Sequence, residues 1–311
     1  MRVLVTGGAG YIGSVLTAKL IEEGFFVNVL DDLSSGHRNN VHPMANFFNG
    51  SILDTKTVNE SMHGCHAVVH LAAKSLVGES VTKSDLYRNT NIEGTKNIIE
   101  SMIANSITNL IFSSTCAVYK QSNNPLGESS PLEPNSPYGE SKLLADKEIE
   151  KYAKSGQIKA VILRFFNVAG SYESNNFKTL NENHDPETHL IPNLKHRRDL
   201  ELFGNDWGTN DGTCIRDYFY VGDLAECIIR ILESKEFPQY EIYNVGSGVG
   251  VSVLEVIKLF ESVKQISITY AIKPRREGDV KQLIADPTKI TRDYNWKTKT
   301  TLQEIINSLS N

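Results

Sequence analysis

The sequence predicts an α/β protein, with a Rossmann-like, doubly wound parallel sheet and a smaller, mixed C-terminal lobe. Two observations predict this class. Short apolar runs alternate with amphipathic stretches through the first half of the 311 residues, a pattern typical of parallel strands joined by crossover helices. A glycine-rich turn directly follows the first apolar run, at the position where such sheets bind the phosphates of a nucleotide.

Six apolar runs are the strand candidates of the first half. Amphipathic stretches between them predict helices, of which residues 12–23 and 87–104 are the clearest. Right-handed crossovers then place helices on both faces of the sheet. The predicted strands are residues 2–6, 26–30, 47–48, 67–71, 110–114 and 160–165.

The second half of the chain is less regular. Residues 170–212 are rich in Asn, Asp, Gly and Pro, which favours loops and short elements covering the end of a sheet. Residues 218–232 read as a strand and then a helix, and residues 251–263 and 302–309 as further helices. We therefore expect a nucleotide-binding domain over 1–170, with a returning segment at about 213–245, and a second lobe over 171–311.

Charge and cysteine content exclude several classes. With 32 Lys and Arg against 37 Asp and Glu, the chain has no basic footprint for nucleic acid or an anionic membrane. No apolar run approaches the roughly 20 residues of a membrane helix. Cys65, Cys116, Cys214 and Cys227 have no CxxC spacing, so we expect free thiols in a reducing cytoplasm.

The glycine turn predicts a dinucleotide site. Gly8, Gly10 and Gly13 match one known glycine spacing, while Gly7, Gly10 and Gly13 match another; in both, the backbone approaches a pyrophosphate at a helix N-terminus. Asp31 follows Gly10 by 21 residues (31 − 10). A carboxylate there accepts bonds from the adenosine ribose and repels a 2′-phosphate, which favours NAD over NADP. The alternatives are a turn without ligand and a solvated loop acid.

Three side chains predict proton transfer beside that site. Thr115 directly follows the predicted fifth strand, and Tyr138 and Lys142 lie at i and i+4, hence on one helix face. A nearby ammonium and a cationic nicotinamide favour the phenolate, so Tyr138 is a candidate base for a sugar hydroxyl that Thr115 orients. Tyr-x-x-x-Lys is a common pattern, and the alternative is an exposed helix face.

At this point the chain resembles the extended short-chain dehydrogenase/reductase family, and within it the UDP-glucose 4-epimerases. The resemblance implies NAD as cofactor, a UDP-hexose (UDP-glucose or UDP-galactose) as substrate, and a homodimer formed by the helices around 87–104 and 138–154. The motifs that carry it are VTGGAGYIGS, VVHLAA, VGESV, IFSSTCAVY, SPYGESK, LRFFNVAG, HDPETHLIP, DGTCIRDY, YNVGSG and PRREGD.

The resemblance also assigns roles to residues. Thr115, Tyr138 and Lys142 are the expected catalytic residues. The expected cofactor-binding residues are Gly7, Gly10, Tyr11, Ile12, Gly13, Asp31, Asp32, Ser51, Ile52, Leu71, Ala72, Ala73, Thr90, Tyr138, Lys142 and Phe166. The expected substrate-binding residues are Thr115, Asn167, His189, Leu190, Phe203, Arg216, Arg276 and Asp279.

The family's reaction is a reversible hydride transfer at C4 of the sugar through a transient 4-keto intermediate. Alternatives are a 4-epimerase for N-acetylated UDP-hexosamines, a regulator that binds NAD or UDP-sugar without turnover, and a net dehydrogenase. Cys116 and Ala117 stand where related dehydratases carry Asp-Glu, which argues against dehydration. His184, Asp185, Glu187 and His189 crowd together, and we expect a substrate loop there with no metal.

Overall fold

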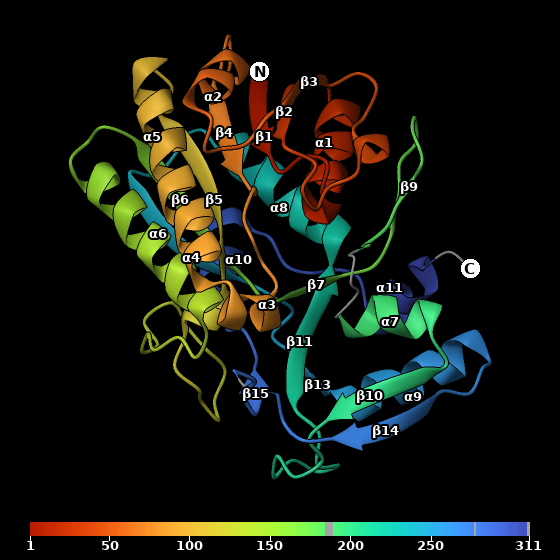
Figure 1. Ribbon diagram of the computed structural model, residues 1–311. Coiled ribbons are helices and arrows are strands. Elements are labelled where there is room, and N and C mark those ends of the chain that lie inside the picture. The colour runs from red at the N-terminus through yellow and green to blue at the C-terminus, as the bar shows by residue number, and fades with distance from the viewer. Residues whose placement is uncertain (184–188, 277, 310–311) are drawn as a thin grey trace.

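A central sheet of seven strands organises the molecule (Figure 1). All its neighbouring strands are parallel, which confirms the predicted doubly wound sheet. The computed structural model describes residues 1–183, 189–276 and 278–309. In spatial order the strands are β12 (Tyr240–Val245), β6 (Lys159–Phe165), β5 (Asn109–Thr115), β4 (Ala67–His70), β1 (Arg2–Thr6), β2 (Phe26–Asp31) and β3 (Asn46–Asn49).

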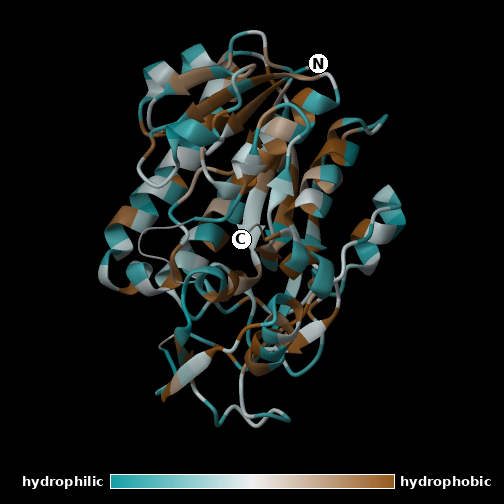
Figure 2. Cartoon of the chain, turned by 90° about the vertical axis from the view of Figure 1, so that its right-hand side faces the viewer, coloured by the Kyte–Doolittle hydropathy of each residue, from teal (hydrophilic) through white to brown (hydrophobic). Residues whose placement is uncertain are grey.

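Helices cover both faces of this sheet (Figure 1). One apolar core joins it to α1 (Tyr11–Glu22) and α8 (Val221–Leu232). A second core on the other face joins it to α2 (Thr55–Ser61), α5 (Gly94–Ala104) and α6 (Pro137–Lys154). Figure 2 shows brown, apolar stretches along the inner strands and teal, polar ones on the outer loops. Burial on both faces explains why these strands are apolar throughout.

The predicted helix over 87–104 is not one regular helix. It begins as α4 (Ser84–Arg88), which follows α3 (Val77–Thr82), and reaches α5 through a π-helical segment, Asn89–Glu93. Such segments insert an extra residue into a turn and are frequent at functional sites. Periodicity along the sequence does not show them, because the apolar spacing changes by only one residue.

The second lobe packs around a third apolar core. The described part of residues 170–212 carries short elements, including α7 (Leu190–His196) and β10 (Asp199–Phe203). The lobe's other strands are β7 (Asn167–Ala169), β8 (Tyr172–Glu173), β9 (Thr179–Leu180), β11 (Ile215–Tyr220), β13 (Gly250–Ser252), β14 (Thr269–Lys273) and β15 (Gln282–Leu283). Its other helices are α9 (Val253–Lys264) and α11 (Leu302–Ser308), and α10 (Thr288–Tyr294) lies against β12.

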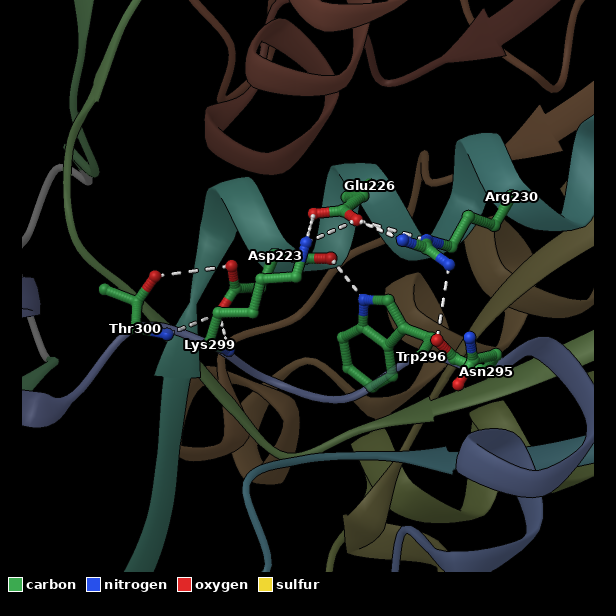
Figure 3. Close-up of polar contacts among 7 residues, drawn as sticks. All are labelled: Asp223, Glu226, Arg230, Asn295, Trp296, Lys299 and Thr300. Carbon is green, nitrogen blue, oxygen red and sulfur yellow. Dashed lines mark hydrogen bonds and ion pairs between the residues drawn. The ribbon is translucent and has the colours of Figure 1, made fainter.

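A C-terminal clip, residues 295–300, ties the end of the chain to α8 (Figure 3). The Asp223 carboxylate accepts hydrogen bonds from the backbone N–H groups of Lys299 and Thr300, at 2.9 and 3.1 Å. Trp296, which is buried, donates from its indole to the Asp223 carbonyl. The clip thus fixes the segment that leads from the large sheet to α11.

Within the residues described, the helices include none whose length and apolar content suit a membrane crossing.

Candidate functional site

The glycine turn forms a tight cradle between β1 and α1. Gly7 has a φ of +73°, and a Cβ there would lie 2.8 Å from the backbone nitrogen of Ala72. A Cβ on Gly13 would lie only 2.1 Å from the carbonyl oxygen of Gly7. The turn therefore uses Gly7 and Gly13 as its essential glycines, with Gly10 as the N-cap of α1.

The first amides of α1 are available to an anion. No side chain among the described residues caps this helix at Gly10, and its first turn carries no acidic residue. The backbone N–H groups of Tyr11, Ile12 and Gly13 thus present the positive end of the helix dipole to the cradle. The Tyr11 hydroxyl donates to the Gly170 carbonyl at 2.6 Å, so this side chain joins the turn to the segment that enters the second lobe.

Asp31 lies at the end of β2, beside the same turn. Its carboxylate accepts from the backbone nitrogens of Ala9 at 2.9 Å and Leu33 at 2.8 Å. Burial raises the pKa of Asp31, and those two hydrogen bonds oppose the shift. Asp32 is exposed and accepts from the backbone nitrogen of Ser34. Of the two carboxylates, Asp31 is therefore the one held against the turn.

The loop after β4 runs directly beneath the cradle. The Thr6 hydroxyl accepts from the backbone nitrogens of Leu71 and Ala72, both at 3.2 Å, and Ala73 follows half-buried. On the other side of β2, Ser51 is half-buried, whereas the Ile52 side chain lies in the core on the α5 side.

The π-helical segment joins the β4 loop to α6. Thr90 lies in it, half-buried. The side-chain amide of its neighbour Asn91 accepts from the Lys74 nitrogen at 2.8 Å and donates to the Lys74 carbonyl and the Ser141 hydroxyl. Asn91, the residue after Thr90, therefore fixes the loop after β4 relative to the helix that carries Tyr138 and Lys142.

Thr115 and Tyr138 lie together at the carboxyl end of β5, and Lys142 lies one turn further along α6. Thr115 ends the strand, and its hydroxyl accepts from the Ala117 nitrogen at 3.2 Å. Helix α6 begins opposite, capped by Ser136, whose hydroxyl accepts from the Gly139 nitrogen. Tyr138 thus lies in the first turn of α6, close enough to Thr115 for that hydroxyl to lower its pKa.

The charge states at this point are set mainly by burial. Burial raises the pKa of Tyr138 to about 12, with smaller raising effects from Cys116 and Asp146. Burial also lowers the pKa of Lys142, and Asp146 opposes that shift. The Lys142 ammonium lies 4.0 Å from the centre of the Phe112 ring. The protein alone therefore keeps the phenol protonated at neutral pH, and a base role requires a further positive charge.

A cationic cluster in the second lobe lies near this point. Arg216, on β11, lies 3.6 Å from the Asp279 carboxylate, and Arg276 lies 3.1 Å from the other oxygen of the same group. The Arg276 guanidinium also stacks over the ring of Phe203 at the end of β10, 4.5 Å from its centre. Arg216 is close enough to Cys116 for its charge to act on the pKa of that thiol. Four of the expected substrate residues therefore lie together.

The other expected substrate and cofactor residues differ in burial and do not form one cluster in the described part of the chain. Phe166 is buried after β6, and Asn167 starts β7 half-buried. His189 is exposed and bonded to Glu182, and Leu190 opens α7. Residues His184, Asp185 and Glu187 of the histidine-rich motif lie outside the described residues. Across the described residues, no group of acidic, His and Cys side chains is arranged to hold a metal ion.

The chain is similar to proteins of one known family. The family model for the NAD dependent epimerase/dehydratase family matches residues 3–246. A UDP-glucose 4-epimerase of Corynebacterium glutamicum is 40% identical over 302 residues, which cover 95% of this chain and 90% of the relative.

Solved structures agree as well. The UDP-glucose 4-epimerase of Brucella ovis in complex with NAD has a TM-score of 0.92 at 37% identity, covering 99% of this chain and 96% of its own. The enzyme of Bifidobacterium longum in complex with NAD+ and UDP has a TM-score of 0.92 at 30% identity, with the same coverage. The chain belongs to the NAD dependent epimerase/dehydratase family, in which its close relatives are UDP-glucose 4-epimerases.

Proposed function

We propose that this chain catalyses the NAD-dependent interconversion of UDP-glucose and UDP-galactose by epimerisation at C4 of the sugar. The observation that carries the proposal is the meeting of Tyr138 and Thr115 at the end of β5, with Lys142 one turn further along α6. The names of two relatives that are 40% identical to this chain, both UDP-glucose 4-epimerases, support the same reaction.

The residues beside that point fit NAD. The cradle around Gly7 and Gly13 leaves no room for a Cβ, and the uncapped amides of α1 suit a pyrophosphate. Asp31 is placed for the adenosine ribose. The Lys142 side chain makes no hydrogen bond to any described residue and lies over the Phe112 ring, so its three N–H groups are free for a ribose hydroxyl. We assign NAD binding to residues 1–170 with 213–245, and UDP-sugar binding to 171–311.

In the proposed reaction Tyr138 accepts the proton of the 4-hydroxyl and later returns it to O4. The glycine turn and Asp31 would hold NAD, which would supply a positive charge and a hydride acceptor for C4 of the sugar. A positive charge beside Tyr138 would lower its pKa from the high value that burial sets. Arg216 and Arg276 hold the diphosphate. Only the sugar therefore rotates between the first and the second hydride transfer.

The proposal predicts the behaviour of Tyr138→Phe. This variant keeps the ring but lacks the hydroxyl, so we expect turnover of UDP-galactose to fall about 10²–10⁴-fold. NAD binding should persist, because the cradle is unchanged. Chromatography of UDP-galactose incubations measures the first quantity, and the cofactor content of purified protein measures the second. Unchanged turnover would contradict the base assignment.

The same assay separates the alternatives. Turnover of UDP-N-acetylgalactosamine alone would identify a hexosamine epimerase, and growth of NADH absorbance in proportion to substrate consumed would identify a net dehydrogenase. Binding of NAD and UDP-galactose with no turnover of any UDP-hexose would identify a regulator.

We also propose a homodimer formed by α5 and α6, which lie together on one outer side of the sheet (Figure 1). Leu86 and Ile103, near this surface, are 40% and 37% exposed, and a partner copy would cover them. Light scattering with size exclusion should give twice the mass of 34.6 kDa. The four cysteines are free thiols, which supports a reducing compartment, and we propose the cytoplasm.

A further inference from the structure

Three buried charged side chains lie together beneath the candidate site. Lys142 and Asp146 are one turn apart on α6, and Arg164 lies opposite on β6. Their exposed fractions are 2%, 3% and 2%. Burying a charge is costly unless it has a partner of opposite charge. The pairing of these three groups therefore shows which charge stabilises which.

The two oxygens of Asp146 are used very differently. Oδ2 accepts from the Ser114 hydroxyl at 3.1 Å and from the Arg164 guanidinium at 3.3 and 3.4 Å. Oδ1 is fully buried and has no hydrogen-bond partner among the described residues. Across the part of the chain that the structure describes, Arg164 and Ser114 therefore occupy only one oxygen of this carboxylate, and Oδ1 keeps its lone pairs unused. The Arg164 guanidinium also donates to the Tyr119 hydroxyl, at 2.9 Å.

Lys142 lacks a direct partner. Over the described ranges, no carboxylate lies within 4.0 Å of its ammonium, which instead sits over the Phe112 ring. Burial favours the neutral amine, and the one charged group that opposes this is Asp146. The spacing of i and i+4 places both side chains on the same face of α6.

The other groups around Lys142 supply no negative charge. His70, on β4, is buried and has a pKa lowered to about 3, in part by Lys142. Cys116, beside Tyr138, has a pKa raised to about 12 by burial, so it is a neutral thiol. Tyr119 is held by the Arg164 guanidinium, and Tyr138 is protonated in the protein alone.

We propose that Asp146 is a positioning residue: its carboxylate, anchored beneath α6 by Ser114 and Arg164, holds Lys142 in the ammonium form. The role of that ammonium in catalysis rests on the proposed function. A cationic Lys142 donates three hydrogen bonds and is the stronger donor to ribose hydroxyls; a neutral amine donates fewer and weaker ones.

The direct test is the titration of Lys142. In protein with ¹³C-labelled lysine side chains, the Lys142 signal is assigned by its loss in Lys142→Met, and its midpoint is followed by NMR. Asp146→Asn should lower that midpoint by about one to three pH units, because an opposite charge is lost from a buried site. The alkaline limb of the pH–kcat profile should move down with it, and Asp146→Glu should restore both.

Two further variants keep the test decisive. Glu140→Gln removes a charge from the exposed side of the same helix and should leave the Lys142 midpoint unchanged. If Asp146→Asn does not fold, Asp146→Asn with Arg164→Gln removes the buried charge imbalance and should show the same lowered midpoint. A wild-type midpoint in the folded single or double variant would overturn the proposal. The NMR titration needs no turnover, so an inactive wild type would refute the proposed reaction alone.

Discussion

His70 lies at the end of β4 beside the glycine turn, and burial sets its charge. The Thr95 hydroxyl donates to the Asn91 carbonyl at 2.7 Å, so it accepts from Nε2 of His70 at 3.1 Å. Nδ1 then accepts from the Thr6 hydroxyl at 2.7 Å. Both ring nitrogens are satisfied in the neutral form, and burial with the nearby Lys142 cation lowers the pKa of His70 to about 3.

This predicts a pH-dependent contribution to stability. An unfolded histidine titrates near 6.5, so between pH 6.5 and about 3 the unfolded state binds the extra proton. The free energy of unfolding should therefore fall as the pH is lowered below 6.5, by up to about 1.4 kcal/mol per pH unit. Urea unfolding at pH 7, 6 and 5 measures this, and His70→Gln should lose less stability over that range than the wild type. Parallel losses in the two proteins would disprove the assignment.

At the scale of elements, the glycine turn connects β1 to α1 without space for a side chain. Gly13→Ala places a methyl group 2.1 Å from the Gly7 carbonyl oxygen, which forces the turn open. We expect NAD affinity to fall by at least about tenfold, since the turn places the amides that bind the pyrophosphate. Calorimetry on protein stripped of cofactor measures the affinity. Gly127→Ala, where a Cβ meets nothing within 4 Å, is the matched control and should bind normally; equal affinities would contradict the prediction.

The C-terminal clip belongs to the scale of the whole molecule, because it connects α8 on the large sheet to the segment leading into α11 (Figure 3). Asp223→Ala removes the acceptor of the Lys299 and Thr300 backbone N–H groups. We expect the free energy of unfolding to fall by about 1–3 kcal/mol, measured by urea denaturation.

Glu226 provides the comparison for the clip. It pairs with Arg230 and Lys299 at the surface, so Glu226→Gln should cost less than about 1 kcal/mol. If the two variants lost equal stability, the backbone contacts of Asp223 would not be what holds the clip.

The sequence predicted some residues of the candidate site and missed others. The turn at Gly7 and Gly13, Asp31, and the i, i+4 pair of Tyr138 and Lys142 are local patterns, and the residues lie where the pattern placed them. Their roles stay predictions. Asp146 carried a readable signal too, since it continues the same spacing four residues after Lys142. Its pairing could not be predicted from local spacing, because its partner Arg164 comes from strand β6.

The sequence by itself determined the class of fold, because alternating apolar strands and amphipathic helices are written in local spacing, and a parallel sheet is how such units bury their faces. The tertiary structure alone decided that Tyr240–Val245 joins the sheet as its seventh strand, that a π-helical segment places Asn91 beside Ser141, and that Arg216 and Arg276 share Asp279. Except for the local pair of Arg276 and Asp279, these contacts join residues distant in the sequence. Packing of the whole chain selects them, because no local periodicity encodes which strands pair or which distant ions meet.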